Sequence, residues 1–276
     1  GEIFVSFCFG FIPVIINCDT GIDDANALVI ACASGRLDIR AVTTVAGNTV
    51  IENSTRNTLN VLHLLGRDDI PVGRGAAGPI FGPLKAAAST HGEDGLGGYR
   101  FERDATAALS PLPAPELIAR TLEASGEPVT LIVLGPATNI GMAFRMDPSI
   151  AENIEEVVFM GGSVDMGNVT AVAEANFFHD PEAVKIVLDS GVKVRIVPLN
   201  ATHSAMLTLE DADELIGLGT RAGKLAGDMV KSRAAASLRM GATDGKAEPG
   251  APATEAGGDD DDNFFDILSI FNNKKN

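Results

Sequence analysis

Short runs of β-branched residues alternate along the chain with segments whose apolar residues recur every three or four positions. The runs predict five buried strands, at 13–18, 39–47, 128–135, 155–162 and 192–199. The spaced segments predict five helices, at 23–34, 51–65, 115–124, 137–146 and 181–189. Hydrophobic strands that alternate with helices are typical of an α/β fold. The sequence therefore predicts a mainly parallel, Rossmann-like sheet with helices on both faces.

Polar motifs stand where several of the predicted strands end. They read "NCDTGIDD", "TTVAGN", "LGPATN" and "PLNATH". In parallel sheets, ligands bind beyond the carboxyl ends of the strands. The motifs therefore predict a ligand site at that edge of the sheet.

The composition changes near residue 241. Residues 1–240 predict one α/β domain, whereas 241–276 are rich in Gly, Ala, Pro and Asp and predict a flexible, low-complexity acidic tail. The apolar opening, residues 1–16, lacks a basic stretch and a small-residue cleavage site, so we do not expect a signal peptide. No apolar run is long enough to span a membrane, and we expect no membrane partner.

The formal net charge of −16 argues against a nucleic-acid partner, because such binding needs a basic face. The segment from Asp244 onward carries eight acids against three lysines, so the remaining body is acidic as well. The three cysteines, Cys8, Cys18 and Cys32, form no C-x-x-C pair. They predict reduced thiols in a cytoplasmic protein rather than a disulfide framework or a zinc site.

Three aspartates, Asp19, Asp23 and Asp24, follow the first predicted strand within six positions. Asp19 is expected at the edge of the sheet, Gly21 in a turn that bulkier residues resist, and the other two in the first turn of a helix. Helix capping and a solvated turn would account for one or two acids. Carboxylates this close repel unless a cation or several donors neutralise them. Their oxygens suit calcium, so the cluster predicts a Ca²⁺ site.

The stretch "DTGIDDA" resembles the D-x-D-P-G-x-D-D-A signature of the inosine-uridine-preferring nucleoside hydrolases. Further stretches agree with that family in the same order: "AVTTVAGN" (41–48), "HGEDGLGG" (91–98), "GPATNI" (135–140), "EEVVFMGG" (155–162), "GNVTAVAEANFFHDPEA" (167–183) and "THSA" (202–205). The resemblance implies a nucleoside hydrolase-like fold. It also implies an enzyme that hydrolyses the N-glycosidic bond of ribonucleosides to ribose and free base.

The resemblance further implies roles for individual residues. Calcium would bind Asp19, Asp24, the backbone carbonyl of Leu134, and Glu248 at the position nearest to the family's last calcium aspartate. Asp19 would also be the general base for the attacking water. The implied substrate-binding residues are Asp23 and Asn176 for the ribose hydroxyls, Asn168 and Glu174 for the 5′-hydroxyl, Asn48 in the sugar pocket and His91 on a loop facing the base. Relatives form dimers or tetramers, so a homo-oligomer is expected.

These residue types suit the chemistry. Cleavage of an N-glycosidic bond builds positive charge on the ribosyl ring, which an anionic, oxygen-lined pocket stabilises. A bound cation lowers the pKa of water and orients the sugar diol.

The chain departs from the family pattern at both ends. Asn17 replaces the first aspartate of the signature and Thr20 replaces its proline. Near the C-terminus, Ala247 and Glu248 stand where the family has the histidine and aspartate of an H-D-P motif. An alternative function is therefore a catalytically impaired member that binds ribose or nucleoside, or serves as an interaction protein. His63, on an apolar helix face, is expected to pack in the core.

Overall fold

The structure is a computed structural model that describes residues 11–107 and 109–243 of the 276-residue chain. Glu248, Cys8 and most of the predicted tail therefore lie outside the described residues. The last described helix ends at Thr243, just inside the predicted tail. No helix in the described part of the chain combines the length and the apolar character needed to cross a membrane.

In the described part of the chain, six parallel strands form one sheet in the order β3-β2-β1-β4-β5-β6. Their bounds are β1 (Ile12–Cys18), β2 (Leu37–Thr44), β3 (Val72–Arg74), β4 (Val129–Val133), β5 (Ile154–Met160) and β6 (Val194–Val197). All five predicted strands are present. The pattern of the sequence misses β3, because three residues are too short to display a period.

The described helices include all five predicted ones. They are α1 (Ile22–Ala33), α2 (Ile51–Leu64), α3 (Ala88–His91), α4 (Ala114–Ala124), α5 (Thr138–Met146), the 3₁₀ helix η1 (Pro148–Asn153), α6 (Ala175–His179), α7 (Pro181–Leu188), α8 (Leu199–Thr202), α9 (Leu209–Gly217) and α10 (Arg221–Thr243). The unpredicted helices are mostly single turns, with the exception of α9 and α10.

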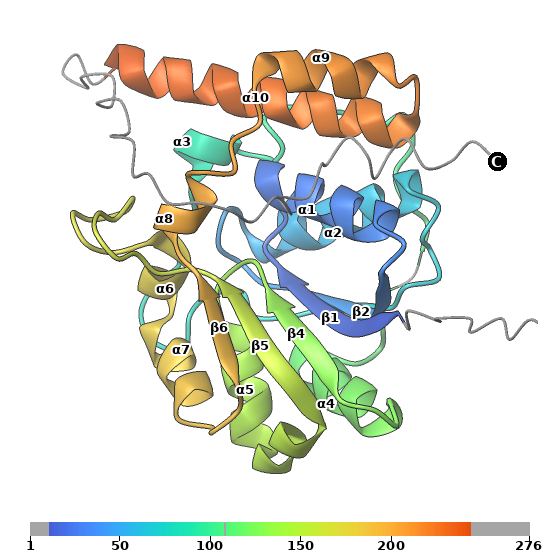
Figure 1. Ribbon diagram of the computed structural model, residues 1–276, viewed down its shortest axis with the longest axis vertical. Helices are drawn as coiled ribbons and strands as arrows, with labels where there is room; N and C mark the ends of the chain where they lie inside the picture. The colour runs from blue at the N-terminus through green and yellow to red at the C-terminus, as the bar shows by residue number, and fades with distance from the viewer. Residues whose placement is uncertain (1–10, 108, 244–276) are drawn as a thin grey trace, which may run out of the picture.

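Helices cover both faces of the sheet, as predicted (Figure 1). On one face α4, α5 and α7 pack against a core that includes Ile15, Leu131 and Phe159. On the other face α1 and α2 lie next to the sheet, and α9 and α10 contribute to a core that includes Val14 and Ile16. Successive residues of β1 thus enter opposite cores, which explains why its sequence is a continuous apolar run.

The prediction for His63 is wrong. Its side chain is 36% exposed, and its Nδ1 lies 3.0 Å from the carboxylate of Asp68. The residue sits at the C-terminal end of α2, where the helix leaves the core and the following turn supplies the acidic partner.

Candidate functional site

The strand order reverses between β1 and β4, and the aspartate cluster lies at this point. Asp19 directly follows the last residue of β1, and Leu134 directly follows the last residue of β4. The backbone N–H of Leu134 donates to the carbonyl of Asn17 at 2.8 Å, which joins the two strand ends. The Asp19 side chain and the Leu134 carbonyl therefore belong to the same carboxyl edge of the sheet.

Asp19 is buried, with 1% of its surface exposed. Its Oδ2 accepts the backbone N–H of Asn48 at 2.6 Å. Its Oδ1 is buried and has no hydrogen-bond donor among the residues that the structure describes. Burial, and then the charge of Asp24, raise the pKa of Asp19 well above its usual value. One oxygen of this carboxylate is thus held, and the other is unpaired.

Asp24 has the same division between its two oxygens. Oδ2 accepts the backbone N–H of Gly21 at 3.0 Å and the side-chain amide of Asn48 at 2.8 Å. Oδ1 is buried without a donor in the described part of the chain. Burial, and then the charge of Asp23, raise the pKa of Asp24 to about 7. Capping of α1 explains one oxygen of Asp24 and leaves the second unexplained.

Glycines surround these carboxylates because there is no room for a side chain. A Cβ at Gly47 would overlap with Oδ2 of Asp19, and a Cβ at Gly135 would overlap with its Oδ1. A Cβ at Gly21 would lie 2.5 Å from Nδ1 of His91. The backbone of Gly21 is extended, with φ −96° and ψ −164°, so the expectation that it serves an unusual turn is wrong.

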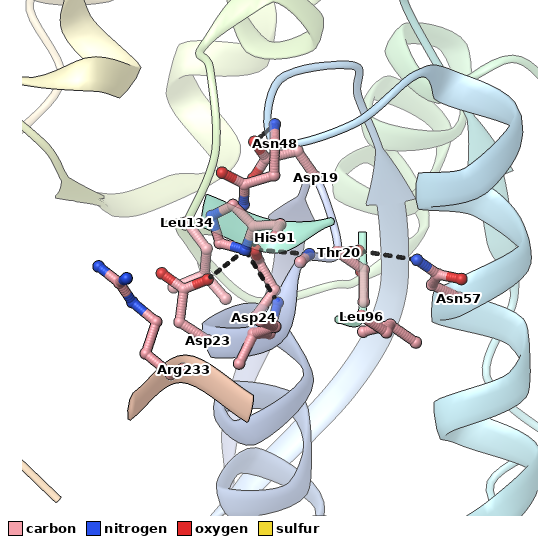
Figure 2. Close-up of polar contacts among 12 residues, drawn as sticks. Asp19, Thr20, Asp23, Asp24, Asn48, Asn57, His91, Leu96, Leu134 and Arg233 are labelled. Carbon is pink, nitrogen blue, oxygen red and sulfur yellow. Dashed lines mark hydrogen bonds and ion pairs between the residues drawn. The ribbon is translucent and has the colours of Figure 1, made fainter. Parts of the chain in front are cut away.

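His91 and Asp23 lie beside the buried pair (Figure 2). His91, from α3, is buried, and its Nδ1 accepts the backbone N–H of Ile22 at 3.2 Å. The same atom lies 3.7 Å from Oδ1 of Asp23, whose side chain is 73% exposed. Burial lowers the pKa of His91, against the opposite effect of Asp23. His91 is therefore a neutral acceptor, and Asp23 faces the open side of the site.

Asn176, from α6, bonds to backbone carbonyls at the carboxyl ends of β4 and β5. Its side-chain amide donates to the carbonyl of Leu134 at 2.7 Å and to that of Met160 at 3.0 Å. A carbonyl oxygen has two lone pairs, so the Leu134 oxygen keeps one for a further partner.

Glu174 and Asn168 lie on the loop that precedes α6. The Glu174 carboxylate accepts the backbone N–H groups of Asn176, Gly162 and Phe177 at 2.8, 2.9 and 3.0 Å. It therefore caps the start of α6. Asn168 is exposed, and its Oδ1 accepts the backbone N–H of Ala175 at 2.9 Å.

Asn17, the residue that departs from the signature, is completely buried below the cluster. Its amide donates to the carbonyl of Pro136 at 3.1 Å, and its oxygen accepts from Thr43 at 3.0 Å and from Asn139 at 2.8 Å. Asn17 is thus hydrogen-bonded as a neutral group through both its amide nitrogen and its oxygen. Asn139 lies in the predicted motif "LGPATN" but was given no individual role, because its partners Asn17 and Thr44 come from strands far away in the sequence.

The model of the inosine-uridine preferring nucleoside hydrolase family matches residues 14–252 of the chain. The chain belongs to this family. It is 40% identical over 219 residues to the pyrimidine-specific ribonucleoside hydrolase RihA of Escherichia coli O7:K1, an alignment that covers 79% of this chain and 70% of the relative. The family and the enzyme class predicted from the sequence, a nucleoside N-ribohydrolase, are thereby confirmed.

Solved structures agree with the assignment. A plant nucleoside hydrolase, the PpNRh1 enzyme, matches with a TM-score of 0.78 and 33% identity, over 83% of this chain and 73% of that chain. A purine-preferring ribonucleoside hydrolase from Gardnerella vaginalis matches with a TM-score of 0.79 and 29% identity, over 84% and 74% of the two chains. The predicted nucleoside hydrolase-like α/β fold is confirmed.

The oxygen atoms of this nucleoside hydrolase fit a hard cation. Asp19 and Asp24 each leave one buried carboxylate oxygen unpaired, and the Leu134 carbonyl has a free lone pair. The described residues contain no group of three or more His, Cys, Asp or Glu side chains placed to hold a metal. A cation here would therefore need backbone, water or substrate oxygens in addition to the two carboxylates.

Proposed function

We propose that the protein hydrolyses the N-glycosidic bond of ribonucleosides with the help of Ca²⁺, releasing ribose and the free base. Asp19, Asp24 and the Leu134 carbonyl would hold the ion. The observation that carries this proposal is the pair of buried, unpaired oxygens, Oδ1 of Asp19 and Oδ1 of Asp24. Leaving two carboxylate oxygens buried without a partner is costly, and a divalent cation removes that cost.

Asp19 is the proposed general base. The N–H of Asn48 fixes one oxygen of its carboxylate, and the other oxygen has no donor among the described residues. When bound, Ca²⁺ would lower the pKa of a water molecule and orient the two ribose hydroxyls. Asp19 takes a proton from the attacking water as the water oxygen joins the anomeric carbon and the bond from that carbon to the base nitrogen breaks. The electron pair of that bond leaves with the base, which then takes a proton from solvent.

We propose that groups on two sides of the Leu134 carbonyl bind the sugar. Asp23 faces the open side, and Asn176 lies directly on the Leu134 carbonyl. Both are proposed to bind ribose hydroxyls, and Asn48 lines the same pocket. Glu174 and Asn168 are proposed for the 5′-hydroxyl, which Glu174 would reach with the one lone pair that its three backbone contacts leave free.

Release of base from inosine and from uridine tests the proposal. Both nucleosides are needed because one relative is named pyrimidine-specific and another purine-preferring. We expect turnover with Ca²⁺, loss of turnover with EGTA, and recovery when Ca²⁺ is restored. Asp19→Ala should abolish turnover, and Asp24→Asn should weaken Ca²⁺-dependent thermal stabilisation. No turnover above the Asp19→Ala background, for either nucleoside, would refute the proposal. Ca²⁺-dependent stabilisation in that case would support the alternative of a ribose- or nucleoside-binding protein.

Glu248 stays a prediction as a further calcium ligand, because it lies outside the described residues. The cytoplasmic location and the homo-oligomeric state also stay predictions. Sedimentation of the purified chain would distinguish a monomer from a dimer or tetramer.

A further inference from the structure

Helix α10 carries an arginine on the side that faces the rest of the protein. Met229 and Ala236 are 0% and 2% exposed, and they share the inward side of the helix. Arg233 lies four residues after the first and three before the second, so it belongs to the same stripe. Arg233 is nevertheless exposed. The inward stripe of α10 is therefore accessible to solvent at one position, and the residue there is the positively charged Arg233.

The exposed position of Arg233 faces the candidate site. Arg233 rises from α10 on the side where Asp23 and His91 lie (Figure 2). Among the described residues, the guanidinium of Arg233 and the carboxylate of Asp23 are the charged groups that act on the imidazole of His91. Within the described residues no carboxylate lies within ion-pair distance of Arg233, and its Nη1 donates only a long bond of 3.4 Å to Ser237. Its donors are thus available to a ligand.

The position of Arg233 is fixed by tight packing. A Cβ at Gly97 would overlap with the hydroxyl of Ser232, the residue just before Arg233. Gly97 follows α3, the helix that carries His91, and the N–H of Gly97 donates to the carbonyl of His91 at 2.8 Å. The loop that holds His91 and the turn of α10 that holds Arg233 therefore form one wall.

In the orientation that the proposed sugar contacts imply, the base of a nucleoside would lie against this wall. In the proposed function the sugar diol binds the ion that Asp19 and Asp24 hold, and the 5′-hydroxyl points toward the loop before α6. The base leaves the anomeric carbon on the other side, where α3 and α10 lie.

The chemistry requires a donor at that place. As the C–N bond breaks, its electron pair moves to the base nitrogen, so the departing base becomes an anion. Asp19 and Asp24 are acidic, and His91 is kept neutral by burial, so none of these offers a positive charge. A preorganised cation is the usual means of stabilising such developing charge.

We propose that Arg233 is a catalytic residue that binds the departing base, an inference that rests on the proposed ribonucleoside hydrolysis. The guanidinium donates hydrogen bonds to the base and stabilises its negative charge, and it keeps its own protons. The base then takes a proton from solvent water, and Asp19 returns to solvent the proton it removed from the attacking water. The net reaction consumes one water molecule.

Two substrates with different leaving groups separate this role from a structural one. A ribonucleoside needs help with its leaving base, whereas 4-nitrophenyl riboside releases a phenolate that is stable in water. We expect Arg233→Ala to lower kcat/KM for inosine or uridine about 100-fold, at the lower end of the loss seen when one preorganised donor is removed. Turnover of 4-nitrophenyl riboside should stay within about threefold of wild type, because that step needs no donor. Arg233→Lys should restore part of the loss.

Lys231→Ala is the matched control. Lys231 lies on the same turn of α10, and its ammonium pairs with Asp213 at 2.7 Å, away from the site. It should leave both substrates unchanged. Thermal unfolding with and without Ca²⁺ checks that Arg233→Ala folds and retains the metal site.

Each result has a separate meaning. Equal losses of Arg233→Ala on both substrates, or no loss on the nucleoside, would overturn the assignment of Arg233 while wild-type activity upholds the proposed function. A wild-type protein that cleaves neither substrate would overturn both. Full activity of Arg233→Lys together with selective loss in Arg233→Ala would support a charge-based role.

Discussion

The backbone N–H of Asn48 donates to Oδ2 of Asp19 at 2.6 Å, and the side chain of the same asparagine donates to Asp24 at 2.8 Å. One residue thus fixes one oxygen of each buried carboxylate and leaves the other oxygen of each directed elsewhere. The first bond comes from the backbone of Asn48 and the second from its side chain. A side-chain substitution therefore removes the bond to Asp24 and keeps the bond to Asp19. This difference permits a precise mutational test of how the pair is oriented.

Asn48→Ala should weaken Ca²⁺ binding about tenfold, the lower end of what losing a group that orients a metal ligand costs. The backbone bond to Asp19 persists, so the protein should fold normally. Titration calorimetry with CaCl₂ measures the effect. Asn53→Ala is the control, because Asn53 lies on α2 and bonds instead to Thr49 and the carbonyl of Glu93. Unchanged affinity in Asn48→Ala would contradict the role of Asn48.

Gly135→Ala should disturb the site by steric conflict. The added Cβ would overlap with Oδ1 of Asp19, so the carboxylate or the β4–α5 loop must shift. We expect a loss of unfolding free energy of about 1–3 kcal/mol, as for overpacked cores, and loss of Ca²⁺-dependent stabilisation. Urea unfolding with and without Ca²⁺ provides both measurements. Gly217→Ala is the control, since nothing lies within 4 Å of a Cβ there, and it should be neutral or slightly stabilising.

His91 should make the folded state less stable in mild acid. Its pKa is lowered by burial, so it is neutral in the folded protein, whereas the unfolded chain binds a proton near the usual value of 6.5. The unfolded state therefore binds more protons below that pH, and the free energy of unfolding falls as the pH drops through it. Protonation would also remove the acceptor of the Ile22 N–H. Asp23 and Arg233 are the charged groups that face the ring, and they act in opposite directions.

Urea unfolding at about pH 7.5 and about pH 5 tests this expectation, with wild type compared with His91→Gln. Wild type should lose more stability than the variant on acidification. Asp24, whose raised pKa favours the folded state at low pH, is present in both proteins, so the difference between them isolates His91. An equal response of the two proteins would show that His91 does not contribute.

Asp180→Ala should be strongly destabilising. The Asp180 carboxylate is completely buried and accepts from the Thr138 hydroxyl at 2.6 Å, the Ile80 N–H at 2.8 Å and the Ala183 N–H at 3.0 Å. Its removal leaves three donors without an acceptor, and we expect a loss of about 3 kcal/mol or more in urea unfolding. Asp180 caps the N-terminus of α7, and the control is Asp189→Ala at the C-terminus of the same helix, which removes an exposed pair with Lys185 and should cost at most about 1 kcal/mol.

Local patterns predicted most of the sheet and the position of the aspartates. Each predicted strand and helix has a period long enough to detect, and Asp19, Asp23 and Asp24 follow β1 without interruption. The contact between Asp19 and Asn48 was expected only in outline, because it depends on β1 and β2 being neighbours. The reason for Gly21 was missed, because the space around a residue depends on His91, far away in the sequence.

Arg233 was missed altogether. Its stripe on α10 contains Leu225, Met229 and Ala236, and an arginine that interrupts such a stripe is a signal that the sequence does carry. The many Ala and Gly residues of α10 weaken the contrast between its apolar and polar sides, which conceals its period. Its approach to His91 depends on tertiary packing, which no spacing along the chain encodes.

The hydrogen bond that joins the ends of β1 and β4 has a consequence for how the substrate preference of this enzyme could be altered. The base of the site is part of the hydrogen-bonded sheet, through the Leu134 N–H and the Asn17 carbonyl, whereas His91 and Arg233 lie on separate segments, the helices α3 and α10. Substitutions in those segments can alter which nucleobase is admitted without rearranging the atoms that act on the sugar. Engineering of substrate preference should therefore begin at the walls and leave the two strand ends untouched.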